Sequence, residues 1–263
     1  MSLLKKGDSM EYIEVNESNI DSEHICCAIS NSKNDTRVIT KKNWMIYNFD
    51  NGLKFIKLNE RGKVFIEYIP SEKAFSPIIA PNYIFINCFW VSGKYAKQGH
   101  GSYLLEKCIV DAKAQNKDGI VVLSSKKKMP FLSDPKFLKA KGFKLCDSVG
   151  YFELLYYPLK DNVIIPQFKD ANKLLKIEDR GIVIYYSNQC PHAQMYVEEV
   201  EQVAIKNDIQ FKKIKLKNYK EAQDAPTPFT TYALFDDGKF ITNEILSVKK
   251  FEKYLEQRKK NDL

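Results

Sequence analysis

Two glycines, Gly99 and Gly101, are separated by a single residue and lie between a strand-like run and a helix-like pattern. Glycine lets the backbone come close to a ligand, and the free N–H groups at a helix N-terminus bind phosphate oxygens with help from the helix dipole. The spacing therefore indicates a phosphate-binding loop. Taken without its context, the same pattern also fits a plain turn with glycine at the helix start.

A single thiol, Cys190, is a second candidate for chemistry. It lies in the run Ser187-Asn188-Gln189-Cys190-Pro191-His192-Ala193, between a strand-like segment and a predicted helix. A helix N-terminus lowers the pKa of a nearby thiol and increases its thiolate fraction. Cys190 is therefore expected to be more reactive than an ordinary cysteine.

The first half of the chain contains the elements that must position the glycine loop. Hydrophobic periodicity and turn residues predict strands and helices in alternation. Strands are expected over residues 10–15, 53–58, 63–69, 83–91, 120–124 and 151–157, and helices over 19–29, 41–49, 101–116 and 135–141. Gly142 is a typical end for the last of these helices. Cys26 and Cys27 would point to different faces of the first helix, so we expect only one of them to be buried.

Proline and polar residues around Pro158 to Pro166 make the strongest break in the chain. We expect two domains, residues 1–160 and 161–263. The second half predicts helices over 170–177, 193–207 and 248–258, and strands over 182–186, 210–216, 231–235 and 239–246. Since no internal repeat is visible, the halves should have different folds.

Composition excludes several classes of protein. With 263 residues, 44% hydrophobic and 28% charged, the chain is neither unstructured nor fibrous, and no run is long enough to span a membrane. Six irregularly spaced cysteines predict reduced thiols, and three histidines in no ligand spacing predict no metal. The formal charge of +8 favours anionic ligands. Because no secretory signal is visible, a cytoplasmic location is expected.

The run from Val91 to Leu105, together with Phe137 to Phe143, resembles the signature motifs of the GNAT superfamily of N-acetyltransferases. The resemblance covers about residues 10–159. It implies an α/β fold whose mixed sheet splays at the cofactor strand, where a backbone irregularity opens a slot for the thioester. It also implies acetyl-CoA as cosubstrate. The residues that would bind acetyl-CoA are Phe89, Val91, Lys97, Gln98, Gly99, His100, Gly101 and Ser102.

Two positions depart from the GNAT pattern. The usual Arg or Gln three residues before the first glycine is Ala96, although Lys97 and Gln98 stand beside it. The Tyr that many GNAT enzymes use as general acid is replaced by Leu138. Water or Tyr151 is the alternative donor of a proton to the leaving thiolate.

The acceptor amine must lose a proton as it attacks the thioester, so a nearby base would help. Glu67, between Ile66 and Tyr68 in a predicted strand, is the candidate, and a solvent-facing Glu is the alternative. Cys88 either faces the acetyl group or packs in the core.

The order of elements in the second half resembles a thioredoxin-like domain. Pro228 occupies the position of that family's cis-proline, opposite Cys190. The resolving cysteine of Cys-x-x-Cys is replaced by Ala193, which leaves a monothiol, glutathione-linked role or a binding module. The two halves together resemble the YoaP-type bacterial acetyltransferases over nearly the whole chain.

The primary hypothesis is an acetyl-CoA-dependent N-acetyltransferase in which a small-molecule or peptide amine attacks the thioester directly. The alternative is a thiol-based redox or binding protein that uses Cys190, with a GNAT domain that has lost catalysis. Nucleic-acid binding is not expected, because basic and aromatic residues do not interleave in a motif. A membrane partner is not expected either, and the protein should be a monomer or homodimer.

Overall fold

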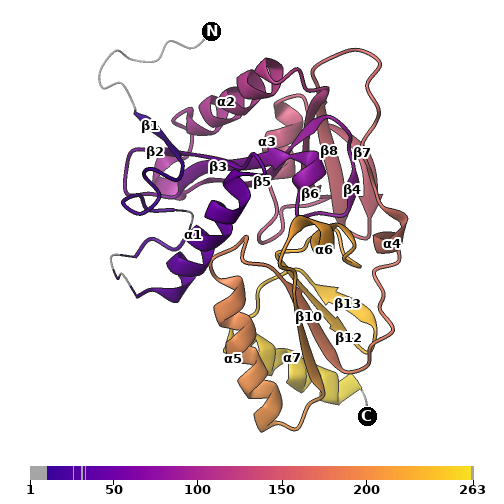
Figure 1. Ribbon diagram of the computed structural model, residues 1–263. Coiled ribbons are helices and arrows are strands. Elements are labelled where there is room, and N and C mark those ends of the chain that lie inside the picture. The colour runs from indigo at the N-terminus through magenta and orange to yellow at the C-terminus, as the bar shows by residue number, and fades with distance from the viewer. Residues whose placement is uncertain (1–10, 26, 31, 33, 262–263) are drawn as a thin grey trace.

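The computed structural model describes residues 11–25, 27–30, 32 and 34–261. Within this part, the first half of the chain builds a seven-stranded mixed sheet and the second half builds a four-stranded sheet (Figure 1). Helix α2 lies over the larger sheet at the top of the view, and α5 and α7 lie beside the smaller sheet at the bottom (Figure 1). The mixed α/β fold class is as predicted.

The larger sheet has the strand order β1-β2-β3-β5-β6-β8-β7. Its only parallel pair among the described strands is β5 with β6. The strands are β1 (Tyr12–Val15), β2 (Lys54–Leu58), β3 (Val64–Pro70), β5 (Tyr83–Val91), β6 (Gly119–Ser125), β7 (Lys144–Val149) and β8 (Phe152–Pro158). The predicted hairpin and the predicted strands after it are confirmed, and β7 is an additional strand.

The sheet opens where β5 leaves β6. These strands pair only from Tyr83 to Ile86 on β5, so the remainder of β5 has no strand partner on that side among the described residues. On the other side, Glu67 of β3 faces Cys88, whereas the next residue faces Ile86. Asn87 is therefore the extra residue of a β-bulge. The predicted irregularity of the cofactor strand is confirmed.

Three helices of the first half lie near their predicted positions: α1 (Thr36–Phe49), α2 (His100–Ala114) and α3 (Pro135–Ala140). The Asp35 carboxylate accepts a hydrogen bond from the Arg37 amide at the start of α1, and Asp134 caps α3 in the same way. The described part of this half also contains two short 3₁₀ helices, η1 (Ser71–Lys73) and η2 (Gly93–Tyr95).

The helix predicted over residues 19–29 is wrong. Residues 17–22 form turns, and the described residues after them have no regular structure. Asn16 accepts a hydrogen bond from the Ser18 amide, and the Asn19 side chain donates to the Glu14 carbonyl. Such local side-chain bonds compete with helix formation. Cys26 lies outside the described residues, as does Met10 of the predicted first strand.

The two faces of the larger sheet have separate cores. On one face, α2 and α3 cover the sheet with side chains such as Leu105 and Leu138. On the other face, the core includes Trp44 of α1 and Phe229 of the second half. The second half therefore shares a hydrophobic core with the first.

The smaller sheet has the order β11-β10-β12-β13. Helices α5 and α7 bury Val197, Val200, Phe251 and Leu255 in its core. Its elements are β10 (Ile182–Tyr186), α5 (Ala193–Lys206), β11 (Phe211–Lys215), α6 (Tyr219–Gln223), β12 (Tyr232–Asp236), β13 (Lys239–Thr242) and α7 (Val248–Asn261). The predicted order is confirmed except that α6 was not expected, the strand predicted to reach residue 246 ends at Thr242, and the helix predicted over 170–177 is only α4 (Asp170–Lys173).

The connection between the halves is part of the fold of the first half. Strand β9 (Gln167–Phe168) pairs antiparallel with β4 (Ile78–Ile79), and Phe168 is buried in the core shared by both halves. Hydrogen bonds continue this contact, because the Ser76 and Thr230 hydroxyls donate across it to the carbonyls of Pro228 and Phe75. The predicted boundary after residue 160 falls between β8 and β9.

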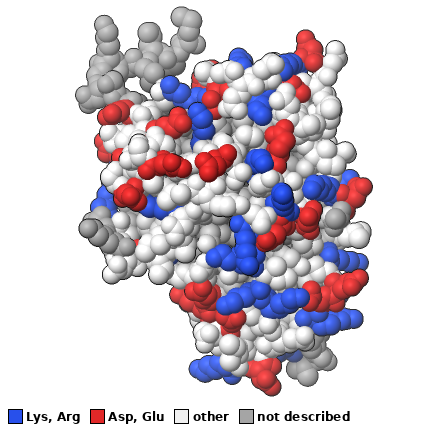
Figure 2. All heavy atoms as spheres, viewed as in Figure 1, with Lys and Arg blue, Asp and Glu red and all other residues white. Residues whose placement is uncertain are grey.

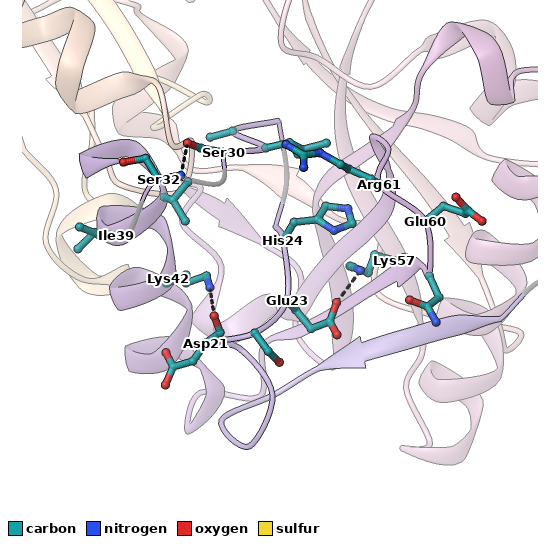
Figure 3. A pocket seen from close by; sticks show the side chains of 15 residues that line it. Asp21, Glu23, His24, Ser30, Ser32, Ile39, Lys42, Lys57, Glu60 and Arg61 are labelled. Atoms are coloured by element: carbon teal, nitrogen blue, oxygen red, sulfur yellow. Dashed lines mark hydrogen bonds and ion pairs between the residues drawn. The ribbon is translucent and has the colours of Figure 1, made fainter. Parts of the chain in front are cut away.

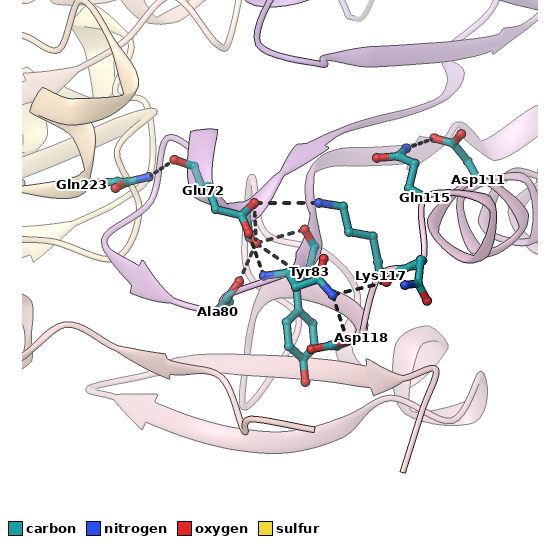
Figure 4. A network of polar contacts seen from close by, with 11 residues as sticks. Glu72, Ala80, Tyr83, Asp111, Gln115, Lys117, Asp118 and Gln223 are labelled. Carbon is teal, nitrogen blue, oxygen red and sulfur yellow. Dashed lines mark hydrogen bonds and ion pairs between the residues drawn. The ribbon is translucent and has the colours of Figure 1, made fainter. Parts of the chain in front are cut away.

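A polar network fixes the start of β5 beside β6 (Figure 4). The Glu72 carboxylate accepts a hydrogen bond from the Asn82 amide at 2.6 Å, and the Asn82 side chain donates to Asp118 at 2.8 Å. Gln223 of the second half donates to the Glu72 carbonyl at 3.1 Å. The network therefore locks the parallel strand pair that precedes the splay.

Charged side chains of both signs are interspersed over both halves on the face that Figure 2 shows. The formal charge of +8 is thus not gathered into one patch on this face. None of the helices in the described part of the chain has the length and apolar character needed to cross a membrane.

Candidate functional site

The glycine loop lines an open cavity of about 920 Å³ between the end of β5 and the N-terminus of α2. We call this cavity the loop groove. Seven of the predicted cofactor residues line it: Phe89, Val91, Lys97, Gly99, His100, Gly101 and Ser102. The eighth, Gln98, does not, and its side chain donates to the Lys94 carbonyl at 2.8 Å. The segment predicted to bind acetyl-CoA therefore lines this groove, and its role in binding stays a prediction.

The glycines shape this loop. Gly99 has a φ of +88°, which side chains rarely adopt, and its carbonyl accepts the Tyr103 amide at 3.0 Å as the helix begins. A Cβ on Gly101 would lie 3.3 Å from the Phe137 ring. The first N–H groups of an α-helix have no partner within the helix. The loop thus presents backbone donors to the groove.

The His100 side chain connects α2 to β1. Its side chain is buried, and Nδ1 lies 2.7 Å from the Tyr12 hydroxyl of β1. Burial lowers the pKa of His100, so a neutral ring is favoured. The imidazole therefore anchors the N-terminus of α2 to β1.

A second cavity, of about 370 Å³, lies where β5 splays from β6. We call it the junction cavity. It shares Phe89, Trp90 and residues 130–132 with the loop groove, so the two are neighbours along β5. Its walls come from both halves of the chain. The lining includes Asn87 and Cys88 of β5 and, from the second half, Gln189, Cys190, Pro191, His192 and residues 228–231.

The predicted thiol site thus lies at the splayed strand, but its surroundings disfavour the expected thiolate. Burial raises the pKa of Cys190 to about 12, which outweighs the opposite effect of the His192 and Ala193 amides. Burial also raises the pKa of Cys88 well above its usual value. The expected low pKa of Cys190 is therefore wrong, because desolvation is a larger effect here than the helix N-terminus.

The cis-proline expectation for Pro228 is also wrong. All peptide bonds between described residues are trans. Pro228 does line the junction cavity with Cys190, as predicted. Its carbonyl accepts the Ser76 hydroxyl at 3.0 Å, so the first half of the chain determines the path of this loop.

The raised pKa predicts that Cys190 is unreactive. A thiol with a pKa near 12 has about a thousandfold less thiolate at pH 7 than one with a pKa near 9. Native protein should therefore show very slow alkylation of Cys190 by iodoacetamide, followed by mass spectrometry, and urea-unfolded protein should react normally. Equal rates in the two states would contradict the buried position.

Glu67, the predicted general base, is in a buried ion pair. Its Oε2 lies 2.5 Å from the Lys41 Nζ, and both side chains are fully buried. The Lys41 ammonium also lies 4.1 Å from the centre of the Trp44 ring. Glu67 faces Cys88 across β3 and β5 but does not line the junction cavity. Its role as a base stays a prediction that needs the pair to open.

Tyr151, the predicted acid, lies in the turn between β7 and β8. Its hydroxyl donates to Asn243 at 2.6 Å, and burial raises its pKa to about 12. It lines neither the loop groove nor the junction cavity. The structure therefore does not bring Tyr151 to the site.

Sequence reasoning missed Asn87 and Gln189, and it assigned no role to His192. All three line the junction cavity. Asn87 could have been found, because a polar amide inside the apolar run of β5 needs a partner or a ligand. Gln189 and His192 carried no such signal, since only the packing of the halves brings them to β5.

A third cavity, of about 820 Å³, lies in the region that replaces the expected first helix (Figure 3). Its lining carries both signs of charge. The Lys57 Nζ pairs with Glu23 at 2.7 Å, and Lys42 donates to the Asp21 carbonyl at 2.9 Å.

The described residues contain no group of three or more His, Cys, Asp or Glu side chains that could hold a metal ion.

Comparison with known proteins places this chain in a family. Residues 210–253 match the YoaP-like family. The chain is 45% identical over 247 residues to the "Uncharacterized N-acetyltransferase YoaP" of Bacillus subtilis, which covers 94% of this chain and 98% of that protein.

Solved structures also resemble part of the chain. The PaiA N-acetyltransferase of Thermoplasma acidophilum, in complex with coenzyme A, is 13% identical, with a TM-score of 0.41 over 57% of this chain and 99% of that one. A putative streptothricin acetyltransferase of Bacillus anthracis, in complex with acetyl coenzyme A, is 16% identical, with a TM-score of 0.40 over 58% and 98%. From the identity with the Bacillus subtilis protein over nearly the full length of both chains, this chain belongs to the YoaP family of N-acetyltransferases.

Proposed function

We propose that the protein transfers the acetyl group of acetyl-CoA to an amine, with the loop groove as the cofactor site. The observation that carries the proposal is the contact between the two cavities at the splayed strand. One cavity offers helix N-terminal donors, and the other lies at the bulge of β5. The name of the Bacillus subtilis relative supports the same activity.

The loop groove suits the charged end of acetyl-CoA. Amides at the start of α2, from His100 to Ser102, would bind the pyrophosphate together with the positive end of the helix dipole. Lys97 and Lys128 line the same groove and add positive charge. Beyond Ile86, the unpaired edge of β5 would bind the pantetheine amides as an additional strand does. The thioester would then lie where the loop groove meets the junction cavity, beside Phe89 and Trp90.

Direct transfer fits the state of the thiols. A cysteine nucleophile must be a thiolate, and burial keeps Cys88 and Cys190 protonated at neutral pH. The amine lone pair would attack the thioester carbon, the C–N bond would form, and the C–S bond would break with its electron pair on sulfur. The same burial argues against the alternative of a redox protein that uses Cys190.

Finer predictions of fold, acceptor, location and oligomeric state belong to this proposal. The thioredoxin-like fold proposed for residues 161–263 is supported by the order and pairing of β10 to β13 with α5 and α7. The acceptor is an amine of a small molecule or a peptide, and we propose a cytoplasmic monomer or homodimer.

Calorimetric titration with acetyl-CoA tests the proposal. We expect a dissociation constant in the micromolar range, about −8 kcal/mol. Acetyl-pantetheine is the matched ligand, because it keeps the thioester but lacks the pyrophosphate and nucleotide. It should bind at least about tenfold more weakly, as the loss of one charge-assisted hydrogen bond would cause. Equal affinity for both ligands, or no heat with acetyl-CoA, would sink the proposal.

A further inference from the structure

Four polar atoms in the junction cavity are buried without a hydrogen-bond partner in the described part of the chain. They are Asn87 Nδ2 and Oδ1, Gln189 Oε1 and His192 Nδ1. Buried polar groups in native proteins are almost always satisfied, so several unpartnered atoms around one cavity indicate a ligand that supplies the missing donors and acceptors.

The second half of the chain is held at the bulge by the same residues. Gln189 is 9% exposed, and its Nε2 donates a hydrogen bond of 3.2 Å to the main-chain carbonyl of Asn87. This bond leaves Gln189 Oε1 and the whole Asn87 carboxamide for a ligand. A donor and acceptor set of this kind is complementary to another carboxamide.

The lining of the junction cavity is uncharged. Among the described residues that form it, none is Asp, Glu, Lys or Arg. Aromatic side chains such as Phe65, Phe75 and Phe229 form much of the wall. A charged group brought into this cavity would lose its hydration without meeting a counter-ion. The cavity therefore selects an uncharged, partly apolar molecule.

Resting on the proposed acetyl transfer, we infer that the junction cavity is the acceptor site for a small uncharged amine that carries a carboxamide. Asn87 and Gln189 hold the carboxamide, and His192 Nδ1 accepts the proton of the amine. The acceptor site is thus completed by the second half of the chain. An apolar ring or chain between the amine and the carboxamide packs against the aromatic wall.

His192 suits the transfer of this proton. With its ring proton on Nε2, Nδ1 is free to accept, and burial with the Arg37 and Lys63 charges lowers its pKa, while Asp35 has the opposite effect. Tyr196 of α5 lies beside the ring, one turn after His192 at the start of this helix. As the C–N bond forms, the proton moves to Nδ1. It then passes to the thiolate that leaves with the electron pair of the C–S bond.

A matched pair of acceptors tests the class of substrate. Para-aminobenzamide and para-aminobenzoate have the same size and an amine that is not protonated at neutral pH, and they differ in the charge of one group. With saturating acetyl-CoA, we expect kcat/KM for the benzamide to exceed that for the benzoate at least about tenfold. A ratio of one or less, or no acetylation of the benzamide, overturns the inference. Acetyl-CoA binding is measured in the same preparation. If acetyl-CoA still binds, only the inferred acceptor is wrong, whereas loss of binding as well would mean that the proposed function is wrong.

Two variants test whether Gln189 binds the acceptor. Gln189→Glu should lower kcat/KM for the benzamide at least about tenfold and leave the dissociation constant of acetyl-CoA unchanged. Gln202→Glu, the same change on the exposed face of α5, is the control and should leave both unchanged. If Gln189→Glu and Gln202→Glu behave alike, the cavity does not hold the acceptor.

The pH profile tests His192. Since the arylamine stays uncharged between about pH 5 and 9, an inflection in kcat/KM belongs to the enzyme. The wild-type rate should fall toward acid, with an inflection below the usual histidine pKa, because His192 is protonated only there. His192→Gln should lower kcat about a hundredfold or more and abolish the inflection. An unchanged inflection in His192→Gln rules out His192 as the proton acceptor.

Discussion

Gly101→Trp should abolish acetyl-CoA binding. Gly101 lies in the first turn of α2 and lines the loop groove, and even a Cβ there would lie 3.3 Å from the Phe137 ring. An indole must therefore turn into the groove and cover the amides of the loop. Loss of two charge-assisted hydrogen bonds costs about 3 kcal/mol or more, which is at least a hundredfold in affinity.

Calorimetry and thermal unfolding together check this expectation. Glu106→Trp introduces the same side chain on the exposed face of α2 and is the control, so it should bind acetyl-CoA like the wild type. The melting temperature shows whether Gly101→Trp still folds. A folded Gly101→Trp with wild-type affinity would place the cofactor elsewhere.

Lys41→Met should destabilise the protein by about 3–5 kcal/mol. The Lys41 ammonium and the Glu67 carboxylate are fully buried and lie 2.5 Å apart, and Glu67 Oε1 has no hydrogen-bond partner among the described residues. Removing the ammonium leaves a carboxylate in the core without its counter-ion. Urea unfolding followed by circular dichroism measures the loss.

The double variant Lys41→Met/Glu67→Gln separates charge from packing. An uncharged amide has a much smaller desolvation cost than a carboxylate, so the double variant should be more stable than Lys41→Met alone. If the two are equally unstable, the loss comes from packing around Lys41 and not from the charge. The single variant Glu67→Gln also tests the predicted base, since loss of a general base lowers kcat about a hundredfold or more.

Much of β5 and of the glycine loop after it could be predicted from sequence because the signals are local. The apolar run of β5 and the glycines before α2 set strand, turn and helix within a few residues. Strand β7 was not predicted, because it is an edge strand whose residues are mostly exposed or half-buried. Its sequence therefore has little hydrophobic alternation. The first predicted helix failed because Asn16 and Asn19 satisfy the backbone locally, which hydrophobic periodicity does not register.

The junction cavity could not be predicted, because it depends on contacts between distant parts of the chain. Cys190 lies about a hundred residues from Cys88, and only tertiary packing brings both to one cavity and removes water from both thiols. A helix N-terminus can be read from local sequence, but the desolvation that outweighs it cannot. The pairing of Glu67 with Lys41 depends on packing in the same way.

The hydrophobic core shared by the two halves limits how this chain can be divided. Phe168, Leu216 and Phe229 come from beyond residue 160, yet they are buried with Trp44 and Phe75 of the first half. A fragment that ends after β8 would expose that apolar face to water and lose one wall of the junction cavity. The two sheets are therefore expected to be kept or lost together, and under the proposed function a chain without its second half would have an incomplete acceptor site.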